Sequence, residues 1–143
     1  MSKNENGEPF LNTGLSHINV AKALVEELKP PIEYLTYNIR RYKVPICLIL
    51  FYTQADVSTQ IKETMRLTDT LKTIKLGNSY FNFVFLLFTE EEDAYSFIKH
   101  AEKTTLKNVR NFLYFEKLPP TVHNSYNFIN SYLFEIEKQE SFF

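Results

Sequence analysis

The sequence predicts an α+β fold, in which helices pack on a mixed and mostly antiparallel sheet. Two nearly continuous apolar runs, 44–52 and 80–88, are typical of strands that are covered on both faces. A Gly-Asn-Ser turn at 77–79 stands directly before the second run and indicates a hairpin. Helical patterns separate the remaining strands, so the predicted order is β-α-β-β-α-β-α behind an N-terminal helical segment.

The chain divides into three parts by composition and periodicity. Residues 1–14 are polar, and we expect them to form a loose tail. Residues 15–42 carry a helical pattern, and residues 43–143 form the α+β domain, because the strand pattern begins there. With 143 residues, the chain is long enough to bury one hydrophobic core.

Two consecutive prolines, Pro30 and Pro31, interrupt the N-terminal helical segment. They predict two helices, near 15–29 and 31–42, because proline lacks an amide donor and clashes with the preceding turn. Apolar residues recur three and four positions apart along both helices, which is the pattern of paired helices. This stripe either forms a seam between two chains of a homodimer or packs on the chain's own sheet. The seam residues are Ile18, Val25, Leu28, Ile32, Leu35 and Ile39.

The other elements are bounded by helix caps, turn residues and prolines. Thr89 and the acidic residues after it favour a helix start, because such side chains suit the positive end of a helix. The predicted elements are a helix that starts at Asp56 or Ser58 and ends near Leu67, a strand at 71–76, a helix from 89 to about 103, a strand at 110–117, and a final helix from 124 or 125 through 136.

Composition and charge exclude several classes of function. The net charge of −1, with acidic and basic residues intermixed, lacks the basic surface that a nucleic acid polymer requires. Three glycines are too few for a glycine-rich loop that wraps phosphates. The longest apolar runs are too short to cross a bilayer, and no signal peptide precedes them. We therefore expect a cytoplasmic protein without membrane insertion.

The residue types that commonly bind metals or act as nucleophiles are scattered along the chain. His17, His100 and His123 have no spacing typical of metal ligands. Cys47 lies inside an apolar run, where a buried and inert thiol is expected. We therefore expect neither a metal nor a cofactor.

Several short motifs, taken in their order along the chain, resemble the GGDEF domain of bacterial diguanylate cyclases. Residues 40–45, Arg-Arg-Tyr-Lys-Val-Pro, are similar to a helix end that leads through a proline into the family's first strand. Arg66-x-x-Asp69, the hairpin around Gly77 and the stretch 85–94 follow in the family's order. The resemblance covers most of residues 32–138 and implies a nucleotide-cyclase or ferredoxin-like sheet.

The departures from the family pattern bear on activity. The resemblance implies two metal-binding aspartates at the end of the first strand, where this chain has Tyr52 and Gln54. Mg²⁺ needs hard carboxylate oxygens to bridge a triphosphate. The signature turn also lacks its acidic pair, which leads us to expect a degenerate domain that is not an enzyme. This turn consists of Gly77, Asn78, Ser79, Tyr80 and Phe81.

Arg66 and Asp69 form a further motif that the resemblance connects with a ligand. Helix positions three apart share one face, and these two side chains offer groups that can bind guanine. In the family, an Arg-x-x-Asp before the signature hairpin is the inhibitory site for cyclic di-GMP. The alternative is an ion pair at a helix end that only positions the chain.

Taken together, these features favour a non-catalytic GGDEF-like signalling domain that acts through contacts with an unknown protein partner. We expect it to form a homodimer through the helices at 15–42. A cyclic di-GMP receptor that uses Arg66 and Asp69 is the first alternative. A structural or assembly adaptor that shares only the α+β fold is the second.

Overall fold

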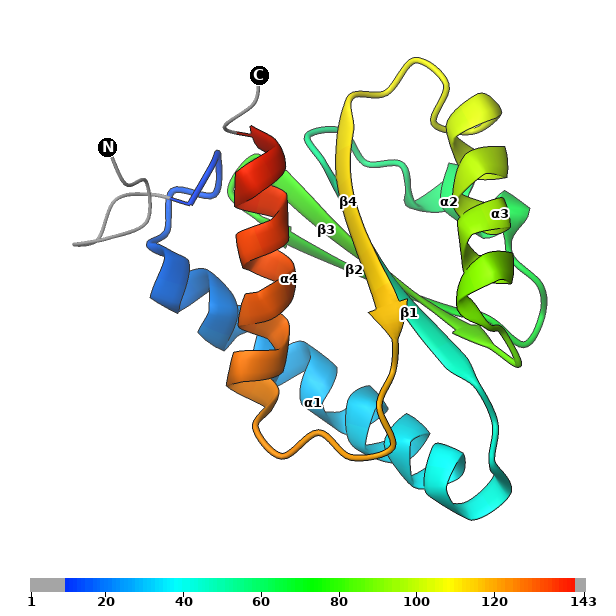
Figure 1. The fold of residues 1–143 in the computed structure, drawn as a ribbon. Helices are drawn as coiled ribbons and strands as arrows, with labels where there is room; N and C mark the ends of the chain where they lie inside the picture. Colours follow the sequence, from blue (N-terminus) through cyan, green and yellow to red (C-terminus); the bar gives the residue numbers. More distant parts are fainter. Residues whose placement is uncertain (1–9, 141–143) are drawn as a thin grey trace.

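The computed structural model describes residues 10–140 of the chain (Figure 1). Within these residues, a long helix precedes the order β-α-β-β-α-β-α that the sequence predicts. The elements are α1 (His17–Tyr42), β1 (Ile46–Thr53), α2 (Ser58–Thr64), β2 (Thr70–Leu76), β3 (Ser79–Leu87), α3 (Glu91–Lys103), β4 (Asn111–Lys117) and α4 (Ser125–Glu140).

The four strands form one antiparallel sheet in the order β2-β3-β1-β4. β1 lies between β3 and β4, and all of its residues are buried. β3 lies between β1 and β2 and is almost entirely buried. Both apolar runs are therefore central strands, and the predicted α+β fold is confirmed. Each of the segments β1-α2-β2 and β3-α3-β4 passes over one intervening strand, which is the ferredoxin-like arrangement.

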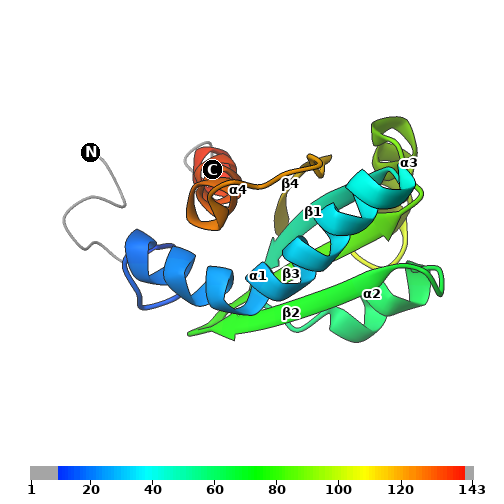
Figure 2. The ribbon, with the colours of Figure 1, turned by 90° about the horizontal axis from the view of Figure 1, so that it is seen from below.

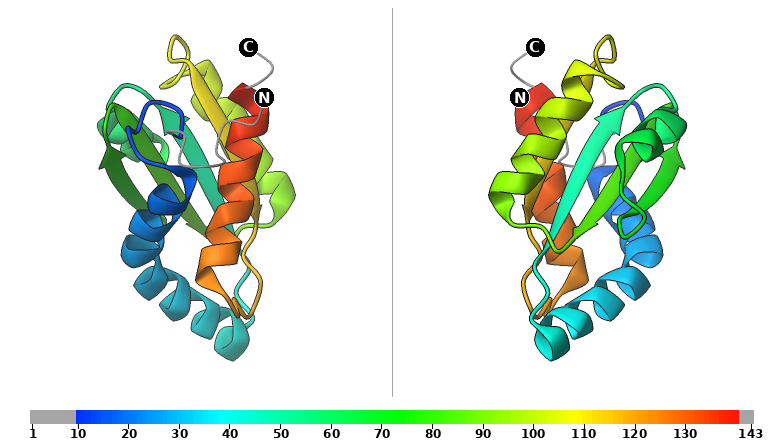
Figure 3. Two further views of the ribbon diagram at one scale, coloured as in Figure 1. Left: turned by 90° about the vertical axis from the view of Figure 1, so that its left-hand side faces the viewer. Right: turned by 90° about the vertical axis from the view of Figure 1, so that its right-hand side faces the viewer.

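Helices cover both faces of the sheet, with α1 and α4 on one side and α2 and α3 on the other (Figure 3). Side chains of successive strand residues point to opposite faces, so the apolar run of β1 supplies both cores. Leu48, Leu50 and Tyr52 belong to the core under α1 and α4. Cys47 and Ile49 belong to the core under α2 and α3.

The structure corrects the division of the N-terminal segment, because α1 runs through Pro30 and Pro31 as one helix (Figure 2). The buried face of α1 extends on both sides of the prolines, and this packing holds the two halves together. The prolines leave the carbonyls of Glu26 and Glu27 without helical donors. Both glutamates are exposed, so water can bond these carbonyls. None of the helices within residues 10–140 has the length and apolar character that a bilayer crossing requires.

The apolar stripe of α1 packs against the chain's own sheet, which corrects its assignment as a seam between chains. Leu28, Ile32 and Leu35 are buried in the core under α1 and α4. Val25 and Ile39 are partly buried against the same core, and Ile18 is exposed. Side chains already removed from water by their own domain cannot bury the same area against a second chain. A homodimer would need another surface.

The segment 10–15 also departs from its prediction as part of a loose tail. Phe10 is fully buried, and its ring lies 5.4 Å from the His17 ring and 6.1 Å from the Phe81 ring, between centroids. The Thr13 hydroxyl donates a 2.7 Å hydrogen bond to the Phe10 carbonyl, which closes the segment into a turn. Leu11 and Leu15 also pack against this core, so three apolar side chains dock the segment. The rest of the predicted tail, residues 1–9, lies outside the described residues.

Candidate functional site

The end of β1 and the β2–β3 turn lie side by side, as the family resemblance implies for a catalytic centre. Tyr52 is the register partner of Phe81, and the two rings meet edge to face with centroids 5.2 Å apart. The Tyr52 hydroxyl shares a 2.5 Å hydrogen bond with the Ser79 hydroxyl, and both residues are buried. Gln54 lies past the end of β1 and is exposed. The structure therefore brings Tyr52, Ser79 and Phe81 together and leaves Gln54 apart.

A second polar group crosses the sheet on its other face. Asn82 of β3 is fully buried, and its amide nitrogen donates to the Phe51 carbonyl at 3.0 Å. The Thr73 hydroxyl donates to the Asn82 amide oxygen at 2.9 Å. These bonds satisfy the amide inside the protein, as a buried polar group requires. Asn82 therefore ties the strands together and is not offered to a ligand.

The segment 10–15 closes over the β2–β3 turn. The Asn78 amide donates to the Asn12 carbonyl at 3.1 Å, and the Asn12 backbone in turn hydrogen-bonds Tyr52. Gly77 has a φ of 60°, and a Cβ added there would lie 2.3 Å from the Thr13 carbonyl oxygen. The turn is thus in direct backbone contact with this segment, and only glycine fits at position 77.

Burial raises the pKa of Tyr52, although its hydrogen bonds with Ser79 and the Asn12 backbone partly oppose the shift. The phenol therefore stays neutral at physiological pH and supplies no negative oxygen to a cation. Within residues 10–140, no group of three or more His, Cys, Asp or Glu side chains is arranged to hold a metal ion.

The pKa of three tyrosines is raised, which predicts a loss of stability at high pH. Burial acts on Tyr52 and most strongly on Tyr132, and a hydrogen bond to Glu116 raises the pKa of Tyr114 to about 12. An unfolded tyrosine ionises near pH 10, so this contribution to stability is complete below that pH. It is lost as the pH rises through the folded pKa values. Urea unfolding from pH 8 to pH 12, with tyrosinate absorbance recorded in parallel, measures this loss.

Tyr52→Phe is the matched variant for that measurement, because it removes one late-titrating phenol and keeps the ring. We expect a shallower loss of stability above pH 10 in this variant than in the natural chain. The nine tyrosines should also titrate in more than one phase. A single phase near pH 10 in the folded protein would contradict the assignment of buried phenols.

Arg66 and Asp69 lie in the turn between α2 and β2, and not on a helix as the sequence predicts, because α2 ends at Thr64. The Arg66 side chain donates to both carboxylate oxygens of Asp69, at 3.2 Å from Nε and 2.9 Å from Nη2. The backbone amide of Arg66 donates to Asp69 at 2.9 Å, and that of Leu87 donates at 3.3 Å. The ion pair is therefore internal to the turn and reaches the end of β3.

Arg66 also holds the chain where β3 ends. Its Nη2 donates to the Leu87 carbonyl at 2.6 Å and to the Thr89 hydroxyl at 2.8 Å. Between these two partners, Phe88 adopts a φ of 55°, which costs a non-glycine residue roughly 1–2 kcal/mol. Arg66 thus fixes both neighbours of a strained residue. Hydrogen bonding to Asp69 raises the pKa of Arg66, so the guanidinium stays charged.

This geometry favours the structural alternative for the motif over ligand binding. The Asp69 side chain is 1% exposed and accepts four hydrogen bonds from within the chain. A carboxylate has about four acceptor positions, so the N–H groups of a guanine would have to displace existing donors. The Arg66 side chain is about half exposed, but its hydrogen bonds already engage Asp69, Leu87 and Thr89.

An open cleft that the sequence does not predict lies at the C-terminal end of α1. It has a volume of about 600 Å³ and is lined by Ile39, Arg40, Lys43, Val44, Pro45, Glu90, Lys117 and Pro120. Arg40 Nη1 donates to the Pro120 carbonyl at 2.6 Å, and Lys117 pairs with Glu90 at 2.7 Å. Five of the lining residues lie close together in the sequence, at positions 39–45, and most of these belong to the motif at 40–45 that resembles the GGDEF family. No local pattern connects them with Lys117 and Pro120.

No protein-family model, curated protein or solved structure matches this chain. The resemblance to GGDEF domains therefore remains one of short motifs in a shared order. The function has to be inferred from the geometry of the described residues.

Proposed function

We propose that this chain is a non-catalytic, cytoplasmic, GGDEF-like signalling domain that acts through contact with another protein. The observation that carries the proposal is the closed position at the end of β1. There Tyr52 and Ser79 hydrogen-bond each other at 2.5 Å, under the segment 10–15. In the family that the motifs resemble, this position holds metal ions and the nucleotide triphosphate.

Two features of this position support a loss of catalysis. The oxygens present belong to a neutral phenol and a hydroxyl, which bind Mg²⁺ far less well than carboxylates do. The backbone of Asn12 and Thr13 also fills the space beside the turn. A nucleotide would have to expel this segment together with the buried Phe10 ring. Such a displacement would cost much of the burial energy of an aromatic side chain.

The surface best suited to a protein partner is the outer face of α1 in its C-terminal half. Tyr34, Tyr37 and Tyr42 are exposed there by 67%, 50% and 63%. The Arg41 guanidinium lies 6.0 Å from the centre of the Tyr42 ring. Tyrosine and arginine are the residues most enriched in the centres of protein interfaces. Figure 3 shows this end of α1 extending past the sheet, where a partner can reach it.

The proposal predicts that the purified protein makes no cyclic di-GMP from GTP with Mg²⁺ or Mn²⁺. It also predicts no heat when cyclic di-GMP is titrated in the calorimeter, because the groups of Asp69 are already bonded. An active diguanylate cyclase under the same conditions is the positive control. Turnover that persists through repurification, or saturable binding that Arg66→Ala abolishes without unfolding, would contradict the proposal.

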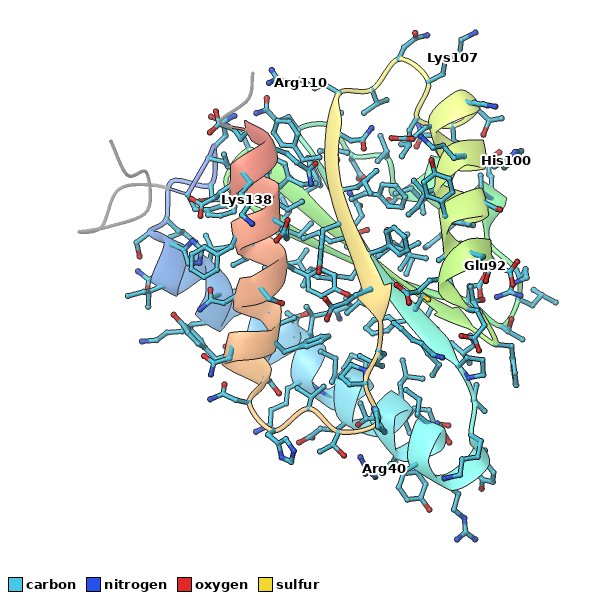
Figure 4. The ribbon with its side chains drawn as sticks, viewed as in Figure 1. Arg40, Glu92, His100, Lys107, Arg110 and Lys138 are labelled. Carbon is cyan, nitrogen blue, oxygen red and sulfur yellow. The ribbon has the colours of Figure 1, made fainter. Side chains whose placement is uncertain are left out.

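The protein contact itself is tested by a photo-crosslinking amino acid in place of Tyr37, in the cell that makes the protein. We expect one discrete adduct from this position. The same probe in place of Lys107, an exposed residue at the other end of the molecule (Figure 4), should give none. An adduct of twice the chain's mass would identify a homodimer. Equal labelling from both positions would count against a specific contact.

A further inference from the structure

The cleft at the end of α1 combines an apolar floor with a basic rim. Ile39, Val44, Pro45 and Pro120 supply the floor. Arg40, Lys43 and Lys117 stand around it, and they come from the end of α1, the turn after it and the end of β4. These segments are distant in sequence, so the tertiary fold alone concentrates their charge.

Two of the three cations have no carboxylate partner among the residues that the structure describes. Arg40 donates to the Pro120 carbonyl, which is neutral, so the guanidinium is positioned but keeps its charge. Lys43 is exposed and makes no ion pair within residues 10–140. Lys117 is balanced by Glu90 at 2.7 Å, in an exposed pair that water and salt screen. The lining therefore carries an excess of positive charge.

Hydrogen bonds hold the backbone from which the cleft residues Lys43 and Pro45 project. Lys43 caps α1 in the left-handed conformation, with a φ of 57°, and its amide donates to the Ile39 carbonyl at 2.9 Å. Pro45 follows, and its carbonyl accepts from the Thr89 amide at 3.0 Å. Lys43 and Pro45 thus belong to the capped end of α1 and to the segment before β1, which hydrogen-bonds the segment after β3. The backbone of the rim is therefore held before any ligand binds, which lowers the cost of binding.

We propose that this cleft binds an acidic segment of the protein partner, with an apolar side chain on the floor and carboxylates beside Arg40 and Lys43. The inference rests on the proposed function, and the cleft adjoins the tyrosine face of α1 described above. The complementarity of charge favours an acidic ligand. The cleft is open, whereas small-molecule sites bury most of their ligand, so a segment of protein chain fits better. A nucleic acid backbone would need more cations than this rim provides.

The test uses the full chain labelled with ¹⁵N and two synthetic peptides. One is a short acetylated peptide in which glutamates flank a leucine, and the other carries glutamine in place of every glutamate. We expect the acidic peptide to shift the amide signals of Ile39, Lys43 and Val44, and to bind more weakly as salt rises. The glutamine peptide should leave these signals in place. Vesicles of anionic phospholipid serve as the third probe.

Lys43→Glu is the informative variant, because Lys43 makes no ion pair within residues 10–140 and a glutamate adds no new backbone strain at its φ of 57°. It should weaken binding of the acidic peptide about tenfold, since it replaces an attraction by a repulsion. Lys107→Glu changes the net charge equally, at the end of the molecule far from Arg40 (Figure 4), and should change the affinity by less than about twofold.

Several results would overturn the inference. These are the absence of any shift in the cleft, equal shifts with the glutamine peptide, equal weakening by both variants, or shifts caused by vesicles alone. The photo-crosslink at position 37 separates this failure from failure of the proposed function. A crosslink without peptide binding leaves the protein contact standing and removes the acidic ligand. If neither the crosslink nor peptide binding is found, the protein contact and the acidic ligand are both contradicted.

Discussion

Leu28→Asp is expected to leave the protein without a cooperative unfolding transition. Leu28 is fully buried on the face of α1 that packs over the sheet, within one contiguous core. Truncating a buried leucine costs about 2–5 kcal/mol, and placing a carboxylate in an apolar core adds several more. The total stability of a domain is about 5–15 kcal/mol, so this one change removes most or all of it. Circular dichroism with thermal and urea melts measures the effect.

Tyr34→Asp is the matched control for this prediction, because it places the same residue on the same helix. Tyr34 is exposed, so the change should alter stability by no more than about 1 kcal/mol. Leu35→Asp, at a buried position, should resemble Leu28→Asp. Sedimentation of each variant decides between this packing and a seam between two chains. A folded monomer from Leu28→Asp, together with a dimeric natural chain, would restore the seam between chains and contradict the packing described here.

Gly77→Ala is the second change with a large expected effect, and Gly14→Ala is its control. Both glycines have positive φ, at 60° and 74°, so each substitution costs about 1–2 kcal/mol of backbone strain. A Cβ at Gly14 has no atom within 4 Å, whereas one at Gly77 would lie 2.3 Å from the Thr13 carbonyl oxygen. Only Gly77→Ala therefore has to push away the segment that carries Phe10.

The difference in stability between these two variants measures the closure of the turn. We expect Gly77→Ala to cost about 2 kcal/mol more than Gly14→Ala in urea unfolding, since burial of Phe10 is loosened. Amide exchange should also accelerate at Asn78, whose amide bonds Asn12 in the natural chain. Equal losses and unchanged exchange would mean that Thr13 does not rest on the turn. The sealed position in the proposed function would then lose its support.

Much of the candidate site follows from local sequence signals. The strand predicted at 44–52 is found at Ile46–Thr53, and the hairpin predicted around 77–79 is found between β2 and β3. The pairing of Tyr52 with Phe81 comes from the structure, because both central strands are nearly continuous apolar runs and such runs specify a register only weakly. The bond between Tyr52 and Ser79 is a consequence of that register. The sequence does not predict the position of Gln54, because a residue past the end of a strand has no register partner.

The segment over the turn could not be predicted in the same way. Residues 10–15 contain three apolar side chains, but they follow a polar stretch and include Asn12, Thr13 and Gly14, which is typical of tails and loops. Phe10 docks because a space remains between Phe81 and His17, which are far apart in sequence. The partners of Arg66 were hidden for the same reason, since Leu87 and Thr89 reach it only through the sheet.

The sequence by itself determined the four strands, the helices between and after them, and the order of these elements, because apolar periodicity, caps and turns act over a few neighbouring residues. Only the tertiary structure decided that α1 continues through Pro30 and Pro31 and that its apolar stripe belongs to its own core. It also decided that Arg40 and Lys117 line the same cleft. These outcomes depend on which apolar surfaces pack against each other, and such packing joins residues that are far apart in the chain.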